Sequence, residues 1–469
     1  MTPATTSIAP HRADTKVQTR APLGTMALIA IFLLALVLRS LNIATMIHEP
    51  DLFTLEDSAI YTGGAKDVLE YGGFMQEGAE GPEVVTERMP LYIMLLAGVS
   101  RLGFDLVTAT VILQAALDSL ACTLIACLGG LFDRRTGLLA GVLAAMWPNL
   151  LVHSAQVLTD SLFMLLITAS ILSFAYYVRR PTVATCAVLA FTMGAALMTR
   201  TAAQFAPPVL AVVLFAVAHL NGMSMRRALL RPVLFCLLVA LVVSPILLRN
   251  ATQFGTVQLT SQSGAHLLYW VVPPTVERAT GIPRDQTEAR LRAESERRIA
   301  EREPDLDPFE NSRILSQLAL ESLVGLPVMA LAKSWATGAA RTLLTPAILH
   351  DQRVRRASNG SFAATQGGLV DRAVGYISNN TSTYRLWAMT GLAGAAIASL
   401  LQLFGLLRAM RINMAATLFG IAVLAYFVAL NGPVGDAKYR LPTEPVLVVL
   451  TAHGLLLLGG AFRRRREAP

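Results

Sequence analysis

The sequence predicts an all-α membrane protein that crosses the bilayer many times, and its composition leads to this fold class. Of 469 residues, 54% are hydrophobic and only 15% are charged, whereas an average soluble chain carries about 25% charged residues. Mean hydropathy is +0.54. The apolar residues gather in runs close to the roughly 20 residues that a helix needs to cross the hydrocarbon core. These numbers exclude a soluble globular, disordered, coiled-coil or small disulfide-rich protein.

Ten apolar segments are predicted to span the membrane. They follow residues 1–23, which are rich in Thr, Ala, Pro and basic residues and are predicted to form a disordered cytoplasmic tail. The first run is too long and too weakly terminated for a signal peptide, so we expect a spanning helix. The predicted spans are Gly24–Ile43, Val107–Leu131, Leu138–Val152, Ser161–Val178, Thr182–Met198, Ala202–His219, Leu229–Leu248, Leu386–Leu407, Ile412–Leu430 and Val446–Phe462.

A further apolar segment, Leu91–Gly103, is short, and the distribution of positive charge decides its placement. If it does not span, the Lys and Arg residues collect in cytoplasmic loops, and the short outer loops keep only Arg200, Lys438 and Arg440. If it spanned, every loop from Arg134 onward would move to the wrong side. We therefore predict an amphipathic helix in the outer interface, with both termini cytoplasmic and the protein in the inner or plasma membrane.

This topology divides the chain into three parts after the tail and leaves two long segments outside the membrane. The second of them is expected to hold a charged helix, Thr287–Arg302, and an amphipathic stretch, Leu318–Leu344. The predicted parts are an N-terminal transmembrane module, 24–248, that includes a first extracytoplasmic loop, 44–106; a large extracytoplasmic loop region, 249–385; and C-terminal transmembrane helices, 386–469.

Polar side chains collect at the predicted outer face. A charge at the bilayer centre costs about 2.5–3.5 kcal/mol, so the placement of such groups is informative. Carboxylates and guanidinium groups that converge on one face indicate an anionic substrate held by Arg, with a carboxylate able to take a proton. The candidates are Glu56, Asp57, Arg88, His153, Asp160, Arg200, Arg249, Asp436, Lys438, Tyr439 and Arg440.

Each candidate also has a structural alternative. Asp57 and Asp160 precede predicted helices, where Asp is a common N-cap. Arg88 and Arg200 could anchor the interface by snorkelling, and the other outer cations could contact lipid headgroups.

Other polar residues are expected to be structural. Asp118 lies mid-span and is expected to accept a hydrogen bond from Gln114 one turn earlier. His266 is interpreted as a loop residue, and no His/Cys cluster has the spacing of a metal site. The cysteines lie in apolar runs and are expected to act as small packing residues; they are Cys122, Cys127, Cys186 and Cys236.

Several short segments, in this order and spacing, resemble one family. They are Glu56–Tyr61 with Leu69–Phe74, Arg88–Tyr92, Trp147–Phe163, Leu197–Thr201, Leu248–Gly255 and Lys438–Pro442. On the same topology they resemble the bacterial GT-C glycosyltransferases, in the group of dolichyl-phosphate-mannose protein mannosyltransferases and aminoarabinose transferases (glycosyltransferase family 39/83-like). The chain departs from the family pattern in having Thr201 in place of a proline, Lys438 as the first basic residue of its last element, and the order Glu56-Asp57.

The resemblance implies roles for these residues. It implicates Asp57 as catalytic carboxylate, with Glu56 as the open alternative, and Asp160 as an acidic residue near the active site. It also implicates Arg88 in binding the lipid phosphate. The further substrate-binding candidates for the lipid phosphate and sugar are Tyr61, His153, Arg200, Arg249, Lys438, Tyr439 and Arg440.

The activity implied is transfer of a sugar from a polyprenyl-phosphate donor to an acceptor hydroxyl on the extracytoplasmic face, with inversion and an Asp general base. No cofactor is expected to be required, and a divalent metal stays open. The expected partners are the donor, a glycan, lipid or protein acceptor and membrane lipid, with no nucleic acid. The sugar and the acceptor are not named by the sequence.

A lipid or sugar transporter or flippase is the alternative, followed by a non-catalytic membrane scaffold. Ten spans suit a transporter, but transport sites usually lie at the midplane on broken helices related by repeats. Only Asp118 is clearly at mid-depth, and no internal repeat is found.

Overall fold

The computed structural model describes residues 23–78, 81–302, 306–360 and 369–466. The tail predicted for residues 1–23 therefore lies outside the described residues, apart from Leu23. The chain is almost entirely helical, with one two-stranded sheet in the described part.

Every predicted span coincides with a helix or with a bent pair of helices. Among the described residues, eight helical segments are long and apolar enough to cross a membrane, and up to ten if each bent pair counts as one span. Among the remainder, α8 is a shorter apolar helix of 17 residues. The chain is thus a multi-pass membrane protein. The helices of the predicted spans are α1 (Thr25–Ala44), α4 (Leu106–Gly130), α5 (Arg134–Met146) with α6 (Pro148–Ser154), α7 (Asp160–Arg179), α8 (Val183–Thr199), α9 (Ala206–Leu220), α10 (Met225–Phe254), α18 (Ser382–Ile412), α19 (Met414–Asn431) and α20 (Glu444–Arg466).

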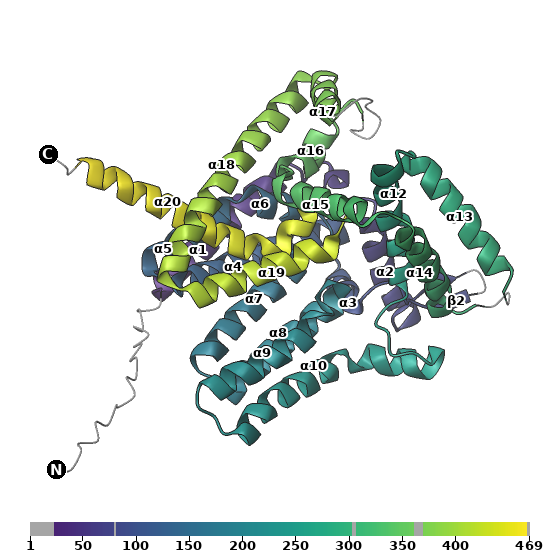
Figure 1. Ribbon diagram of the computed structural model, residues 1–469, viewed down its shortest axis with the longest axis horizontal. Coiled ribbons are helices and arrows are strands. Elements are labelled where there is room, and N and C mark those ends of the chain that lie inside the picture. The colour runs from purple at the N-terminus through teal and green to yellow at the C-terminus, as the bar shows by residue number, and fades with distance from the viewer. Residues whose placement is uncertain (1–22, 79–80, 303–305, 361–368, 467–469) are drawn as a thin grey trace, which may run out of the picture.

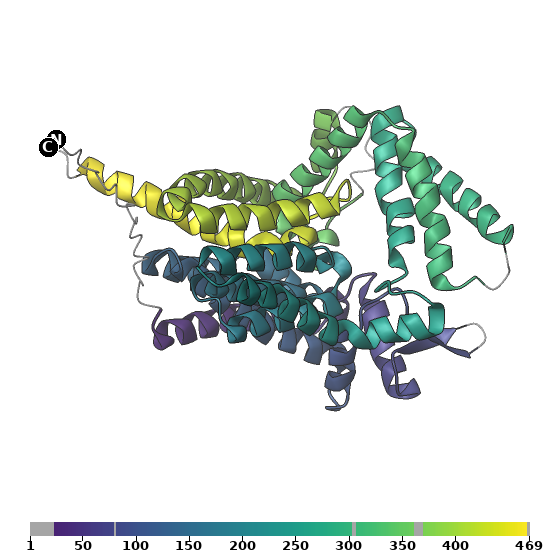
Figure 2. The ribbon, with the colours of Figure 1, turned by 60° about the horizontal axis from the view of Figure 1, so that its bottom comes forward.

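The spanning helices run side by side as one bundle, and the remaining elements gather at one end of it (Figure 1, Figure 2). Figure 2 shows the start of α1 and the end of α20 at the opposite end. The chain therefore crosses the bundle an even number of times. We refer to the end that carries the extra-membrane elements as the outer end.

The third predicted span is broken. Helices α5 and α6 meet at an angle of 46°, and Trp147 between them is extended, with φ −70° and ψ 121°. Pro148 explains the break, because proline has no N–H to donate and disfavours helical geometry in the residue before it. The break redirects α6 beneath the elements of the outer end, where it contacts the segments around residues 347–350 and 437–443.

The first outer segment holds a short helix that does not span. Helix α3 has 11 residues, about 16 Å at 1.5 Å per residue, against a hydrocarbon core of about 30 Å. This length agrees with the interfacial placement predicted for Leu91–Gly103. The sequence did not predict the hairpin. The elements are η1 (Pro50–Phe53), α2 (Ser58–Tyr71), β1 (Met75–Gly78), β2 (Gly81–Val84) and α3 (Pro90–Ser100).

The second outer segment is helical throughout its described part. The charged helix expected at Thr287–Arg302 is α13, whereas Leu318–Leu344 is two helices that meet at 113°, not one stretch. Gly325 and Pro327 lie at the bend, and both disfavour a continuous helix. The elements are α11 (Gln262–Ala265), η3 (His266–Val271), α12 (Val272–Thr280), α13 (Arg284–Ala300), α14 (Pro308–Val324), α15 (Val328–Leu344), η4 (Ala347–His350), α16 (Gln352–Arg355) and α17 (Leu369–Ser378).

A fully buried ion pair lies inside the bundle. Arg39 of α1 binds Asp118 of α4, with side-chain exposures of 0% and 1%. The same guanidinium donates to the carbonyl oxygens of Ala35 and Ala145, each at 3.1 Å, and to the sulfur of Cys122 at 3.2 Å. One cation thus ties three spans together, and a buried pair of this kind survives only when its hydrogen bonds are satisfied.

Gln114, predicted as the partner of Asp118, is bonded elsewhere. Its side-chain amide donates to the carbonyl oxygens of Ser154 and Gln156 at 3.2 and 2.7 Å, and its oxygen accepts from the Tyr92 hydroxyl at 2.6 Å. The predicted Asp118–Gln114 bond is therefore wrong, because Arg39 supplies a charged donor on a neighbouring helix. Gln114 joins α3 to the turn before α7.

Candidate active site

Asp57 lies at the start of α2, held against the turn before α7. The Ser58 hydroxyl donates to the carbonyl oxygen of Val157 at 2.8 Å, and the Val157 N–H donates to the Phe53 carbonyl at the same distance. Although Asp57 occupies the N-cap position, its side chain accepts no capping bond. Its carboxylate oxygen instead lies 3.6 Å from Nζ of Lys438, and the side chain is 46% exposed. The carboxylate is therefore open to a substrate.

Asp160 and Arg200 form a second ion pair at the outer ends of α7 and α8. The Arg200 guanidinium donates to the Asp160 carboxylate and, at 3.3 Å, to the Thr159 hydroxyl. It also lies 5.7 Å from the centre of the Phe163 ring. Asp160 is the first residue of α7, and the N-cap position predicted for it is occupied by Thr159. Its carboxylate positions Arg200, which ends α8 with an extended backbone.

Tyr61 lies one turn into α2, between these charges. Burial raises the pKa of its phenol. The positive charges of Arg200 and Arg88 lower this pKa in part, and the negative charges of Asp160 and Asp57 raise it. The net pKa is raised, so the hydroxyl stays protonated near neutral pH and can donate a hydrogen bond. The pKa of Tyr61 thus responds to the charges of Arg200, Arg88, Asp160 and Asp57.

Arg88 is a further cation of the candidate site, and one of its N–H groups has no acceptor in the described part of the chain. It lies just before α3, whose first residue is Pro90. Its Nε is buried and has no hydrogen-bond partner among the described residues. A buried unpaired donor is costly, which is accepted where a ligand supplies the missing oxygen.

The short helix η6 (Ala437–Thr443) contributes Lys438 and Tyr439 to the candidate site. The Asp436 side chain accepts the backbone N–H of Lys438 at 3.0 Å and so caps this helix. Nζ of Lys438 lies 5.4 Å from the centre of the Tyr439 ring. These contacts fix the ammonium group above Asp57.

His153 forms a ring contact with His350, a histidine pair that the sequence did not predict. Its Nδ1 is 2.9 Å from the Asn149 carbonyl oxygen, and its ring centre is 5.7 Å from that of His350. Nε2 of His350 lies 3.3 Å from the Asp436 carboxylate, and burial lowers the pKa of His350. His350 had no local signal, because it meets His153 only through the fold.

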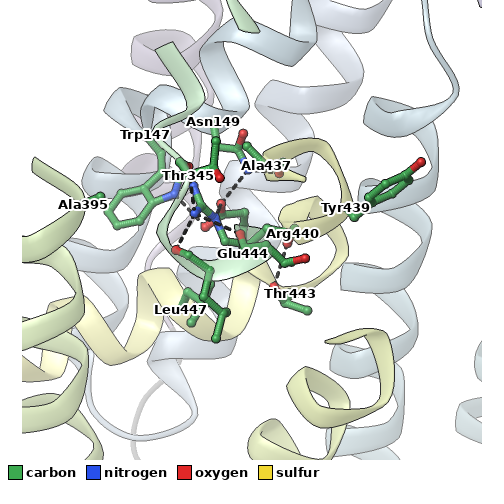
Figure 3. A network of polar contacts seen from close by, with 12 residues as sticks. Trp147, Asn149, Thr345, Ala395, Ala437, Tyr439, Arg440, Thr443, Glu444 and Leu447 are labelled. Carbon is green, nitrogen blue, oxygen red and sulfur yellow. Dashed lines mark hydrogen bonds and ion pairs between the residues drawn. The ribbon is translucent and has the colours of Figure 1, made fainter. Parts of the chain in front are cut away.

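Arg440 is engaged in a buried network (Figure 3). Its Nε donates to Glu444 at 2.8 Å, and one terminal nitrogen faces three carbonyl oxygens within residues 342–345, the nearest at 2.6 Å. Glu444 also accepts from Trp147 Nε1 and Asn149 Nδ2, each at 2.7 Å. The network joins α15, α6 and α20, a structural role that the sequence did not predict. The phosphate contact expected of Arg440 stays a prediction.

Replacing Glu444 with Gln should lower stability by about 1–3 kcal/mol, because Arg440 loses its buried counter-charge while the side-chain volume is kept. The measurement is the thermal unfolding midpoint of the purified protein in detergent. The matched control is Glu310→Gln on the exposed first turn of α14, where no measurable change is expected. Equal midpoints for wild type and Glu444→Gln would contradict a structural role for the network.

Arg249 binds the first outer segment. It donates to the Val85 carbonyl oxygen at 2.9 Å and to the Asn250 side-chain oxygen at 2.8 and 3.0 Å, and it lies 5.8 Å from the centre of the Phe74 ring. It therefore ties the end of α10 to the hairpin. The structure shows no contact between Arg249 and the other predicted site residues.

Glu56 is directed away from its neighbour. It is exposed and lines a surface pocket of about 310 Å³ with Gln352, Arg355 and Arg356. Of the two adjacent carboxylates, Asp57 is the one that contacts Lys438.

No group of three or more His, Cys, Asp or Glu residues in the described part of the chain is arranged to hold a metal ion. The expectation that no metal is required stays a prediction.

Comparisons with known proteins identify the fold. The dolichyl-phosphate-mannose-protein mannosyltransferase family matches residues 107–259. The archaeal oligosaccharyltransferase AglB from Archaeoglobus fulgidus, in complex with an inhibitory peptide and a dolichol-phosphate, matches 94% of this chain at 14% identity with a TM-score of 0.51. The chain has the GT-C fold. The resemblance drawn from the sequence motifs is thus confirmed.

Two further solved structures are similar to the chain. The Archaeoglobus fulgidus oligosaccharyltransferase in complex with Zn and sulfate gives a TM-score of 0.50 at 14% identity over 94% of this chain. ArnT from Cupriavidus metallidurans bound to undecaprenyl phosphate matches 92% of this chain and 78% of its own at 14% identity, with a TM-score of 0.40. The GT-C chain described here spans about half the length of the two oligosaccharyltransferase chains, 51% and 50%. No curated protein matches the sequence.

Proposed function

We propose that the chain is a membrane glycosyltransferase that moves a sugar from a polyprenyl-phosphate donor to an acceptor hydroxyl on the extracytoplasmic face. The observation that carries the proposal is the meeting of Asp57 and Lys438, 3.6 Å apart, beside the Asp160–Arg200 pair. These residues come from distant parts of the chain and converge at the outer end of a GT-C bundle. An open carboxylate among fixed cations suits transfer from a phosphate leaving group.

The donor phosphate is assigned to Arg88 and Arg200. Negative charge grows on the phosphate as the bond from the anomeric carbon to its oxygen breaks, so positioned cations lower the barrier. Guanidinium groups can grip two phosphate oxygens at once. The buried Nε of Arg88 has no acceptor in the part of the chain that the structure describes, and the Arg200 guanidinium donates a hydrogen bond to the Asp160 carboxylate.

Asp57 is assigned as the general base. The acceptor oxygen attacks the anomeric carbon from the face opposite the phosphate, and its proton passes to the Asp57 carboxylate. The products are the glycosylated acceptor with inverted configuration and the polyprenyl phosphate. Asp160 is a positioning residue, because its carboxylate is already bound by Arg200 and only 5% of its side chain is exposed.

The flippase alternative would need an accessible polar site at mid-depth in the bundle, and Asp118 is the sequence's candidate for it. The mid-depth Asp118 is paired with Arg39 and packed at 1% exposure. A carboxylate that is paired and packed in this way is not available to bind a transported molecule, whereas transporters place accessible polar sites near the midplane.

A reconstituted transfer assay tests the proposed function. The lipid-linked sugar that accumulates in a deletion strain identifies the donor, which is then supplied with envelope acceptors to the purified protein in nanodiscs. We expect release of polyprenyl phosphate together with a glycosylated product. Movement of labelled lipid across liposomes without any sugar transfer would instead establish a flippase.

Replacing Arg88 with Gln should raise the KM for the donor by roughly 10- to 100-fold, because a charge-assisted hydrogen bond to phosphate is worth about 1.5–3 kcal/mol. Initial rates against donor concentration measure the effect. Arg101→Gln is the control, since Arg101 is an exposed arginine at the other end of α3. An unchanged KM in Arg88→Gln would remove Arg88 from the phosphate site.

A further inference from the structure

A second polar pocket lies on the outer side of Lys438. It has a volume of about 170 Å³ and is formed by η3, α12, the start of α13, α15, and η6 with the loop before it. Its lining includes three cationic side chains, Arg284, Arg341 and Lys438, one carboxylate, Asp436, and the aromatic ring of Trp270. We call it the outer cationic pocket.

The pocket carries more positive than negative charge, although Lys438 is paired with Asp57 at 3.6 Å. In the described part of the chain, Arg284 and Arg341 form no ion pair, while Asp436 is already engaged by His350 at 3.3 Å and by the Lys438 N–H. The pKa of the neighbouring Arg278 is also affected by the positive charge around the pocket. Burial lowers the pKa of Arg278 and the charge of Arg341 lowers it further, while Glu277 raises it in part and Arg284 lowers it.

The arginine side chains of this pocket are accessible to a ligand, because Arg284 and Arg341 are both exposed. Arg284 stacks on Trp270, with its guanidinium carbon 5.8 Å from the centre of an indole ring. Arg278 is fixed by a 2.8 Å bond to the Ser334 hydroxyl. Arg284 and Arg278 are therefore held in place, and planar guanidinium groups such as those of Arg284 and Arg341 suit phosphate or carboxylate oxygens.

The pocket shares a wall with the candidate active site. Lys438 lines the pocket and also reaches Asp57 at 3.6 Å. Tyr439 lines it as well, beneath the Lys438 ammonium group. A molecule anchored in the pocket can therefore present a hydroxyl to Asp57.

We propose that the outer cationic pocket binds an anionic group, a phosphate or a carboxylate, of the acceptor, so that this enzyme glycosylates anionic acceptors. The inference rests on the proposed function, which already assigns the donor phosphate to Arg88 and Arg200. The pocket is built by the outer helices rather than by the spans, so it faces the compartment from which a polar acceptor arrives.

Binding of inorganic pyrophosphate tests the pocket. The full-length protein in neutral detergent is first saturated with undecaprenyl phosphate to fill the donor site, and pyrophosphate is then titrated by calorimetry. We expect one further anion to bind, with a Kd raised at least fivefold in Arg341→Gln. The control is Lys333→Gln, which removes an exposed cation from the same helix outside the pocket and should leave the Kd unchanged.

The outcomes separate the pocket from the donor site. Unchanged undecaprenyl phosphate binding in Arg341→Gln shows a folded protein with an intact donor site, so a selective loss of pyrophosphate binding supports the inference. Equal pyrophosphate affinities in wild type and Arg341→Gln overturn it. Tighter, Arg341-dependent binding of dioctanoyl phosphatidylglycerol also overturns it, because the cations then serve a lipid headgroup. Failure of the wild type to bind undecaprenyl phosphate counts against the proposed function alone, since pyrophosphate can be titrated without the lipid.

Discussion

Turnover should fall by roughly 10²- to 10⁴-fold when Asp57 is replaced by Asn, with little change in the KM for the donor. This is the usual range for loss of a general base. The amide keeps the size of the side chain but cannot take the proton of the acceptor hydroxyl. Because the Asp57 carboxylate makes no capping bond and is 46% exposed, the substitution should leave the fold intact. Initial rates of sugar transfer at saturating donor measure the effect.

The neighbouring residue supplies the control. Glu56→Gln removes the same charge one residue earlier, from a side chain that lines a different pocket with Arg355 and Arg356, and its turnover should match wild type. Asp160→Asn should act differently, raising the KM for the donor because Arg200 loses its partner. Normal turnover in a well-folded Asp57→Asn protein, or a large loss in Glu56→Gln, would assign the base elsewhere.

The spans were predictable from the sequence because hydrophobic length is a local property. The same holds for α13, whose charge pattern is readable within a few turns. The breaks were less visible. Pro148 and Pro327 lie at breaks between helices, inside segments that composition alone joins, since hydropathy does not record a missing N–H.

The choice between Glu56 and Asp57 needed the fold. Both residues have the same charge in the same turn, and the difference between them is set by Lys438, which lies near the other end of the chain. His350 was missed for the same reason, since its partners His153 and Asp436 come from two other segments.

Two ion pairs show what a local rule can and cannot find. Arg440 and Glu444 are separated by four residues, a spacing at which helical side chains meet, so their pairing had a signal in the sequence. Asp118 also had a polar residue four positions away, Gln114, but its partner is Arg39 on another helix. A buried carboxylate takes the strongest donor within reach, and sequence spacing does not reveal which helix supplies it.

Replacing Asp118 with Asn should destabilise the protein by about 3–5 kcal/mol, because it leaves the guanidinium of Arg39 buried without a counter-charge. Arg39 is fully buried, and its other acceptors are two carbonyl oxygens and a sulfur, none of which carries a formal negative charge. The measurement is the free energy of unfolding in mixed detergent micelles. The control is Asp105→Asn, at the exposed N-cap of the same helix, where the amide can still accept the Thr108 N–H and the expected cost is below 1 kcal/mol.

A double variant then distinguishes the contribution of the ion pair to stability from that of the other contacts of Arg39. Arg39→Met combined with Asp118→Leu removes both charges at similar volume, and replacing a buried ion pair by apolar residues is often neutral or stabilising. We therefore expect the double variant to recover most of the stability lost in Asp118→Asn, and to keep transfer activity, since neither residue lies at the outer end of the bundle. A double variant as unstable as the single one would show that Arg39 acts mainly through the carbonyl oxygens of Ala35 and Ala145, as a tie between helices rather than as the counter-ion of Asp118.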